Sequence, residues 1–302
     1  MQLIKPDVNF DFVGKRKLAL IVSIALILIG LASLVIKGGP DYGIDFAGGT
    51  LVQVKFTQPT DAAAIKKAMT GLDVGNPVVQ RFGDNQNEFL IRVEQTSSEL
   101  QGLSIDIQNT LDKTYSKGNV EIRRVEMVGP QVGKDLRVKG LKAIFYAMIG
   151  LLVYISWRFE FRFAVGAIVA LVHDVMITLG AFSVFGKEID LPIIAAFLAI
   201  IGYSLNDTII VYDRIRENLG KHNKESFPYI VNRSINETLS RTLLTSGTTL
   251  LVVLALFILG GGVIHNFAFA MLVGVVVGTY SSIFVASPIL IFWQQKKAAS
   301  KK

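Results

Sequence analysis

Six long apolar segments dominate this sequence and decide its fold class. Each has close to the ~20 residues that an α-helix needs to cross the hydrocarbon core of a bilayer. They cover residues 18–36, 141–157, 163–185, 191–212, 243–259 and 267–293. The first is longer than the apolar part of a secretory signal and is not followed by a small-residue cleavage site, so we expect it to remain as a helix. The sequence therefore predicts a polytopic α-helical membrane protein with six transmembrane helices.

Basic residues mark one side of the predicted bundle. If the N-terminus is inside, lysine and arginine gather in all four inner segments, and the two short outer loops carry only Lys187. Positive charge favours the cytoplasmic side. The sequence therefore predicts a bacterial inner-membrane protein with both termini in the cytoplasm. The net charge of +7 is then a topology signal, and no nucleic-acid partner is expected. The segment 214–241 mixes basic and apolar residues and is predicted to lie along the inner surface of the lipid bilayer.

The chain divides into four predicted parts. Residues 1–36 hold the cytoplasmic N-terminus and the first helix, and residues 37–140 form one extracytoplasmic domain. Residues 141–293 hold helices two to six, and residues 294–302 form a basic cytoplasmic tail. There is no cysteine, which excludes disulfides and cysteine-ligated metal sites.

The extracytoplasmic domain is predicted to be ferredoxin-like. Alternating apolar residues predict strands over 50–56, 77–82, 88–93 and 119–128. One helix, capped by Thr60, is expected after the first strand, and a second is expected to begin at Ser97 or Ser98. The order βαββαβ is that of a small α+β sheet backed by two helices. The segment has no histidine and no carboxylates at metal-ligand spacing, so binding is favoured over catalysis and no metal or cofactor is expected.

Glycine, proline and aspartate gather where this domain joins the membrane helices. They predict turns, tight backbone approach and hinges at both connections. The residues are Asp41, Asp45, Gly48, Gly49, Gly129, Pro130 and Gly133.

Few ionisable residues fall inside the apolar segments, and each is costly enough there to suggest a function. His173 and Asp174 lie in the third segment and Asp207 in the fourth, while Arg241 begins the fifth from the inner side. Asp207 and Arg241 are predicted to reach similar depth and to meet across a helix interface. Protonation of Asp207 would then cancel much of their attraction and change the helix packing.

Polar residues at helical spacing predict a hydrated seam beside this pair. Thr245, Thr248 and Thr249 follow Arg241 on one helix face, and Tyr203 lies one turn before Asp207. The candidate ion-coupling residues are therefore Asp207, Arg241, Asp174, His173, Thr245, Thr248, Thr249 and Tyr203. A static buried pair, or an arginine that only extends to the interface, is the alternative. For His173 a plain hydrogen-bonded helix contact also remains open.

Several of these stretches resemble signatures of one family. The segments are 41–50 (DYGIDFAGGT), 129–133 (GPQVG), 173–174 (HD), 203–218 (YSLNDTIIVYDRIREN) and 234–242 (SINETLSRT). Together they resemble the SecD/SecF family of protein-export membrane proteins, within the RND superfamily. The resemblance extends over nearly the whole chain.

The resemblance implies both a fold and a function. It implies half of an RND-type bundle that pairs with a SecD subunit and associates with the SecYEG channel and other Sec accessory membrane proteins. It also implies that a proton or sodium gradient drives the activity, which promotes late steps in the export of unfolded polypeptides. It also implies that the essential carboxylate is Asp207 and its basic partner Arg241.

Four other functions can be weighed against the sequence. An intramembrane aspartyl protease needs a second carboxylate in a Gly-x-Gly-Asp setting, which is absent, and no enzymatic activity is expected. An ATP-driven pump needs a phosphate-binding loop, and residues 180–188 have the wrong spacing and end in glutamate. A passive translocon scaffold and an RND-type exporter of small molecules remain as alternatives.

Overall fold

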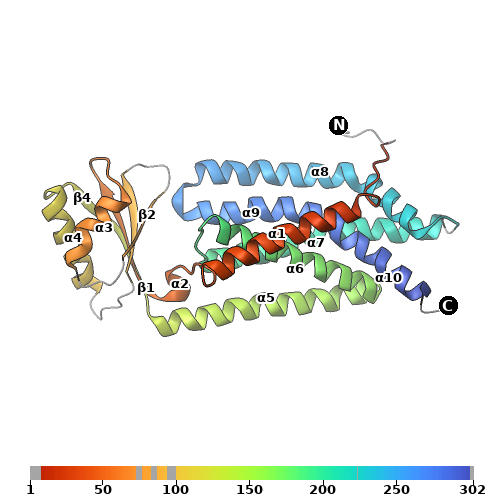
Figure 1. The fold of residues 1–302 in the computed structure, drawn as a ribbon, viewed down its shortest axis with the longest axis horizontal. Helices are drawn as coiled ribbons and strands as arrows, with labels where there is room; N and C mark the ends of the chain where they lie inside the picture. The colour runs from red at the N-terminus through yellow and green to blue at the C-terminus, as the bar shows by residue number, and fades with distance from the viewer. Residues whose placement is uncertain (1–7, 73–76, 83–86, 94–99, 223, 300–302) are drawn as a thin grey trace.

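The computed structural model describes residues 8–72, 77–82, 87–93, 100–222 and 224–299. An elongated bundle of long helices carries a small α/β domain at one end, and both chain termini lie toward the other end (Figure 1). Within the described residues, six helical spans are long and apolar enough to cross a membrane. They are α1 (Arg16–Ile36), α5 (Pro130–Arg158), α6 (Phe161–Val184), α7 (Leu191–Lys221), α8 (Phe227–Leu259) and the run of α9 (Gly261–Ser281), η2 (Ser282–Ala286) and α10 (Ser287–Ala299).

Helices α6 and α7 form the centre of the bundle. Both bury one long face, whereas α1, α5 and α8 leave broad apolar surfaces exposed, as suits helices that face lipid or a partner helix. Helix α9 packs tightly on α7 because Gly274 and Gly278 leave room for Ile200 and Ser204. A Cβ atom at Gly278 would come within 2.9 Å of the Ser204 Cβ, so this glycine sets the distance between the helices.

The domain between α1 and α5 contains a four-stranded sheet. In chain order it comprises α2 (Ile44–Ala47), β1 (Gly49–Phe56), α3 (Ala62–Ala68), η1 (Met69–Gly71), β2 (Val78–Arg81), β3 (Glu88–Val93), α4 (Leu100–Tyr115) and β4 (Val120–Val128). The strand order is β2-β3-β1-β4, and every neighbouring pair is antiparallel. The strands and helices follow in the predicted order.

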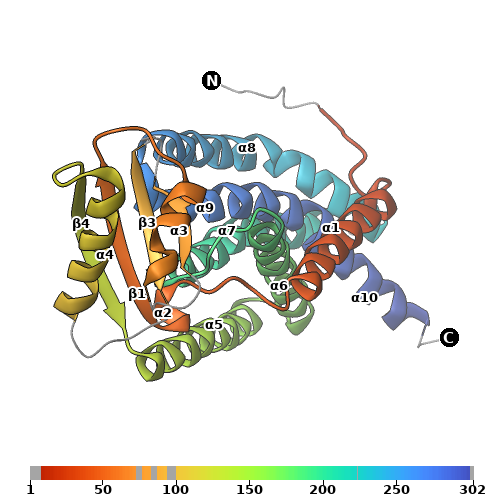
Figure 2. The same ribbon diagram turned by 60° about the vertical axis from the view of Figure 1, so that its left-hand side comes forward.

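One face of this sheet is packed and the other faces the membrane helices. Helices α3 and α4 cover the packed face, where Val52, Val54 and Phe56 alternate inward from β1 (Figure 2). Asp61, not Thr60, caps α3: its Oδ1 accepts from the Ala64 amide at 2.7 Å. Both residues are good caps, and only Asp61 stands directly before the helix. The predicted start of the second helix at Ser97 or Ser98 lies outside the described residues.

The segment 214–241 is not a helix along the bilayer surface. Helix α7 continues to Lys221 and α8 begins at Phe227, so the two spans form a protruding helical hairpin (Figure 1). Ile230, Ile235 and Leu239 are buried in its packing. An amphipathic pattern fits either arrangement, because it shows only that one helix face is covered.

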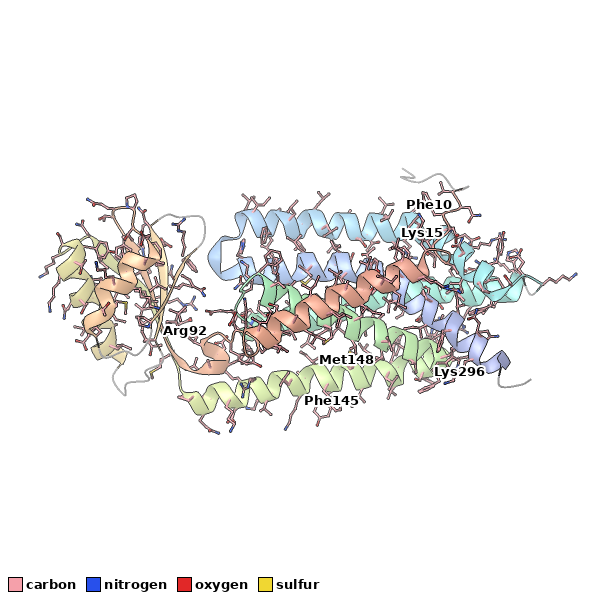
Figure 3. The ribbon with its side chains drawn as sticks, viewed as in Figure 1. Phe10, Lys15, Arg92, Phe145, Met148 and Lys296 are labelled. Carbon is pink, nitrogen blue, oxygen red and sulfur yellow. The ribbon has the colours of Figure 1, made fainter. Side chains whose placement is uncertain are left out.

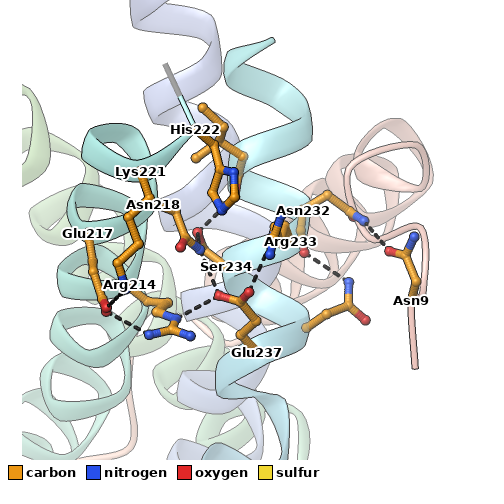
Figure 4. Close-up of polar contacts among 12 residues, drawn as sticks. Asn9, Arg214, Glu217, Asn218, Lys221, His222, Asn232, Arg233, Ser234 and Glu237 are labelled. Carbon is orange, nitrogen blue, oxygen red and sulfur yellow. Dashed lines mark hydrogen bonds and ion pairs between the residues drawn. The ribbon is translucent and has the colours of Figure 1, made fainter. Parts of the chain in front are cut away.

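Polar contacts close this hairpin. The Glu237 carboxylate accepts from Arg214 at 2.6 Å, from Asn218 at 2.7 Å and from Arg233 at 2.9 Å (Figure 4). These contacts join the ends of α7 and α8 beside the α7–α8 connection, on the two helices that carry Asp207 and Arg241.

Candidate ion-coupling site

Asp207 lies midway along α7, in the interface that this helix forms with α8 and α9. Helix α7 begins with Asp190 as its cap and Pro192 in its first turn, both of which favour a helix start. The Asp207 side chain is fully buried. Its Oδ2 accepts from the Ser246 hydroxyl of α8 at 3.3 Å, and Ser246 also contacts the Thr279 hydroxyl of α9 at 2.7 Å.

The other carboxylate oxygen of Asp207 has no hydrogen-bond partner. Among the described residues, the hydroxyls of Tyr203 and Thr242 are likewise buried without a partner. Tyr203 lies one turn from Asp207 on α7, and Thr242 one turn from Ser246 on α8, so both project near the carboxylate. Unpaired polar atoms are costly in an apolar interior. This interface therefore offers oxygen atoms that can take up a proton or a cation.

The structure does not form the predicted Asp207–Arg241 ion pair. Arg241 is exposed and is not within ion-pair distance of Asp207 in the part of the chain described, although its charge still attracts that carboxylate from farther away. The predicted threonine face is also rotated. Thr248 is exposed and donates to the Leu244 and Thr245 carbonyl oxygens of its own helix, and Thr249 donates to Thr245.

The face of α8 that packs toward Asp207 is instead formed by Thr238, Thr242 and Ser246. Residue 242 lies ~100° around the helix from residue 241, and residue 246 lies the same angle from residue 245. The buried polar face of α8 is therefore rotated by one residue from the predicted one. Whether Arg241 acts in ion coupling stays a prediction.

A second buried carboxylate, Asp174 on α6, has hydrogen-bond partners on both of its oxygen atoms. Its Oδ1 is hydrogen-bonded to His173 Nδ1 at 2.9 Å. Its Oδ2 accepts from the Ser204 hydroxyl of α7 at 2.5 Å and from the Ser281 hydroxyl of α9 at 2.8 Å. Ala170, Asp174 and Thr178 lie on one buried face of α6, in agreement with their helical spacing.

His173 extends this network to α1. Its Nε2 is hydrogen-bonded to the Ser23 hydroxyl at 3.0 Å, and that hydroxyl contacts the Tyr280 hydroxyl at 3.1 Å. Tyr280 in turn donates to the Ala19 carbonyl oxygen at 2.6 Å. The network joins α1, α6, α7 and α9, and its serines could not be assigned from sequence because each lies on a different helix.

At the end of the bundle that carries the sheet domain, which we expect to be the outer end, the segment before β1 is bound to the α6–α7 connection. Gly43 donates its amide to the Ile189 carbonyl at 2.9 Å, and Ile189 donates to the Asp41 carbonyl at 2.7 Å. The Asp45 Oδ2 accepts from the Leu191 amide at 2.9 Å. Asp45 therefore caps α7 from a distant segment and ties the outer domain to the helix that carries Asp207.

The glycines predicted as hinges lie at contact points. Gly48 has a positive φ of 79°, and a Cβ there would lie 2.9 Å from the Pro130 Cα. A Cβ at Gly133 would lie 3.1 Å from the Gly48 amide nitrogen. Gly129 precedes α5, with Pro130 as its first residue, and Gly49 also has a positive φ. These residues allow the segment before β1 to pack closely on the start of α5. Whether they also act as hinges stays a prediction.

A further contact joins β3 to the same connection. Arg92, on the sheet face toward the bundle, forms an ion pair with Glu188 at 3.1 Å and donates to the Tyr42 carbonyl at 2.7 Å (Figure 3). Burial raises the pKa of Glu188, and Arg92 opposes that shift. Burial also raises the pKa of Asp190 to about 6, and neighbouring Asp45 adds to the effect. The contact region between the segment before β1 and the α6–α7 connection, the outer junction, thus holds two carboxyl groups that keep their protons to higher pH than free ones do.

Comparison with known proteins gives the family. The family model described as "Protein export membrane protein SecD/SecF, C-terminal" matches residues 107–296, and the SecD/SecF GG motif model matches residues 33–60. The chain belongs to the SecD/SecF family of protein-export membrane proteins. The second match covers Asp41, Asp45, Gly48 and Gly49, the residues at the outer junction.

Curated relatives match along nearly the whole chain. The protein translocase subunit SecF of Magnetococcus marinus is 51% identical over 294 residues, covering 96% of this chain and 94% of that relative. The subunit of the same name from Vibrio alginolyticus is 46% identical, covering 96% of this chain and 91% of the relative. The chain is therefore a SecF-like translocase subunit, and its relatives are named as transport components, not as enzymes.

Solved structures agree with this assignment. A crystal structure of SecDF from Thermus thermophilus, described as a translocon-associated membrane protein, matches with a TM-score of 0.87 and 36% identity. The match covers 97% of this chain and 40% of the SecDF chain. A SecDF structure in a super-membrane-facing form matches with a TM-score of 0.71 and 35% identity. This chain is a multi-pass membrane protein that spans less than half of the longer SecDF chain.

Proposed function

We propose that this SecF-like subunit couples movement of a proton or sodium ion through Asp207 to late steps of polypeptide export. The observation that carries the proposal is the buried Asp207 carboxylate with one unpaired oxygen. Tyr203, one turn away on α7, and Thr242, one turn from the Ser246 that contacts Asp207, carry further unpaired hydroxyls. An ion that binds there changes the charge between α7 and α8 and so changes their preferred packing.

Helix α7 supplies the link from this site to the outer domain. Its outer end is capped by Asp45, and the connection before it is bound by Arg92 through Glu188. A movement of α7 therefore acts directly on the domain that we propose to be ferredoxin-like and to hold exported chains. One charge moving through 100 mV supplies about 2.3 kcal/mol, which biases two domain positions without unfolding a cargo protein.

We further propose a bacterial inner-membrane setting with both termini in the cytoplasm. The SecDF likeness supports pairing with a SecD subunit, and association with SecYEG follows as part of the same proposal. The exposed face of α8, with Leu244, Gly247 and Leu251, is a suitable surface for the SecD helices. On this face Arg241 would meet a carboxylate of the partner or reach Asp207 after a movement of α8.

Export into vesicles with an imposed ion gradient tests the proposal. Asp207→Asn should keep assembly with SecD and lose the gradient-dependent part of export. Asp213→Asn is the matched control, because Asp213 is a half-exposed aspartate on the same helix. If Asp207→Asn still responds to the gradient like the control, the chain acts as a passive scaffold and the proposal fails.

A further inference from the structure

A groove on the outside of the bundle lies between α1, α6 and α10. It encloses about 590 Å³ and is lined mainly by apolar side chains, among them Leu20, Ile24, Val172 and Ile289. Helices α1 and α6 approach each other most closely at Gly30 and Gly180, where the two backbones meet. The groove occupies the part of α1 from that contact toward Arg16.

The turn at the start of α10 opens the groove. Residues Ser282–Ala286 form a π-helical turn, the Ser287 hydroxyl donates to the Ser282 carbonyl at 2.9 Å, and Pro288 follows. Such turns and prolines change the direction of a helix. As a result α10 leaves the axis of α9 and diverges from α1, as Figures 1 and 2 both show.

The groove has the depth of one membrane leaflet. Its lining on α1 runs from Arg16 to Ile27, which is roughly 16 Å along a helix axis. This is about half of the ~30 Å hydrocarbon core of a bilayer. A peptide helix that crossed the membrane would need twice this length, whereas one acyl chain fits it.

The mouth of the groove is cationic. Arg16 and Lys17 line it together with Gln295, and none of the described residues contributes a carboxylate to its lining. In the part of the chain that the structure describes, neither cation forms an ion pair. Lys15 and Lys296 lie at the same end of the bundle (Figure 3). Helix α1 also begins there without a side-chain cap and with no acidic residue in its first turn, so its positive end adds to the field.

We propose that this groove binds an anionic phospholipid, with its phosphate at Arg16 and Lys17 and one acyl chain along the apolar lining. The end of the acyl chain farthest from the phosphate covers the Ser23–His173 hydrogen bond, because both residues line the groove. The lipid then holds α1 on the helix that carries Asp174. This inference rests on the membrane setting alone and not on ion coupling at Asp207.

Fluorescence quenching by brominated lipids tests the proposal. Trp157 and Trp293 are replaced by phenylalanine, and one tryptophan is introduced at Ile24 in the groove or at Ile21, an exposed residue on another face of α1. The bilayers contain phosphatidylcholine and phosphatidylglycerol, and one of the two lipids is brominated in each experiment. Brominated phosphatidylglycerol should quench Ile24→Trp more strongly than brominated phosphatidylcholine does. The two brominated lipids should quench Ile21→Trp equally. Each cation should contribute about fivefold to the preference.

The double variant R16Q/K17Q should abolish this preference, while Lys224→Gln, which removes a cation from the α7–α8 connection, should leave it intact. Native mass spectrometry of the protein with its own tryptophans gives a second measurement. Phosphatidylglycerol should stay bound to the wild-type chain and to Lys224→Gln, and be lost from R16Q/K17Q. Equal quenching by the two lipids at Ile24→Trp, or retention of phosphatidylglycerol by R16Q/K17Q, would overturn the proposal.

Discussion

Asp174 on α6 and Asp207 on α7 are both buried carboxylates, but their surroundings differ. Asp174 is bonded by His173, Ser204 and Ser281, with its closest contact at 2.5 Å. Asp207 has a single contact at 3.3 Å and one free oxygen. Fully satisfied polar networks fix a structure, whereas partly satisfied ones leave capacity for a ligand. We therefore propose that Asp174 holds the helices together and that Asp207 binds the ion.

The largest expected effect is on function at Asp207. Asp207→Asn should reduce gradient-dependent export by about tenfold or more, because an amide cannot exchange a proton or hold a cation in the same way. Its thermal stability in detergent should be unchanged or higher, since the buried charge is removed. Export rate and melting temperature measured on the same preparation check both parts. A strong loss of stability would break the comparison with Asp174.

The largest expected effect on stability is at Asp174. Asp174→Leu leaves His173, Ser204 and Ser281 without their shared acceptor and should cost about 3 kcal/mol. Unfolding of the purified protein by heat, with Asp207→Leu as the matched variant, measures the difference. Equal losses at the two positions would show that the hydrogen-bond networks do not distinguish them.

The outer junction should show a pH dependence that Asp190 causes. Its pKa is raised from 3.8 to about 6, so the folded state holds this proton more tightly than the unfolded state does. Stability from this group is full below about pH 4 and falls by up to about 3 kcal/mol as pH rises toward and past 6. Asp190→Asn keeps a helix-capping residue and should flatten that slope. Unfolding midpoints of both proteins between acid and neutral pH test this, and parallel curves would count against it.

The smallest effect separates two serines. Ser204→Ala removes a short bond to Asp174 and should cost about 2 kcal/mol, whereas Ser246→Ala removes a long bond to Asp207 and should cost about 0.5 kcal/mol. Unfolding of the two variants in parallel measures the order. If Ser246→Ala were the more damaging change, Asp207 would be anchored in the way that we ascribe to Asp174.

Much of the fold could be predicted from local pattern. The six spans and the order of strands and helices follow from apolar length and from alternation, and both appear in the structure. Helix α5 begins at Pro130, before the apolar segment that starts at residue 141. Its first turns carry charged residues. An apolar count cannot find such a start.

The site was predicted less completely. Asp207 and Asp174 stand out because charge is rare in apolar helices. Their partners Ser246, Ser204 and Ser281 do not stand out, since serine is common in helices and the pairing depends on how helices cross. The predicted polar face of α8 was wrong because it included Arg241, which is exposed, and one residue turns a helix by ~100°.

Infrared difference spectroscopy of the reconstituted protein tests the central claim most directly. A carboxylic acid C=O band that forms as pH falls reports protonation of a buried carboxyl group, and added sodium would suppress it if sodium competes for the same oxygen atoms. Our account predicts that, beside the band of Asp190, which the Asp190→Asn background removes, there is a band that Asp207→Asn removes and Asp174→Asn leaves in place. A titrating band that persists in Asp207→Asn and disappears in Asp174→Asn would contradict it.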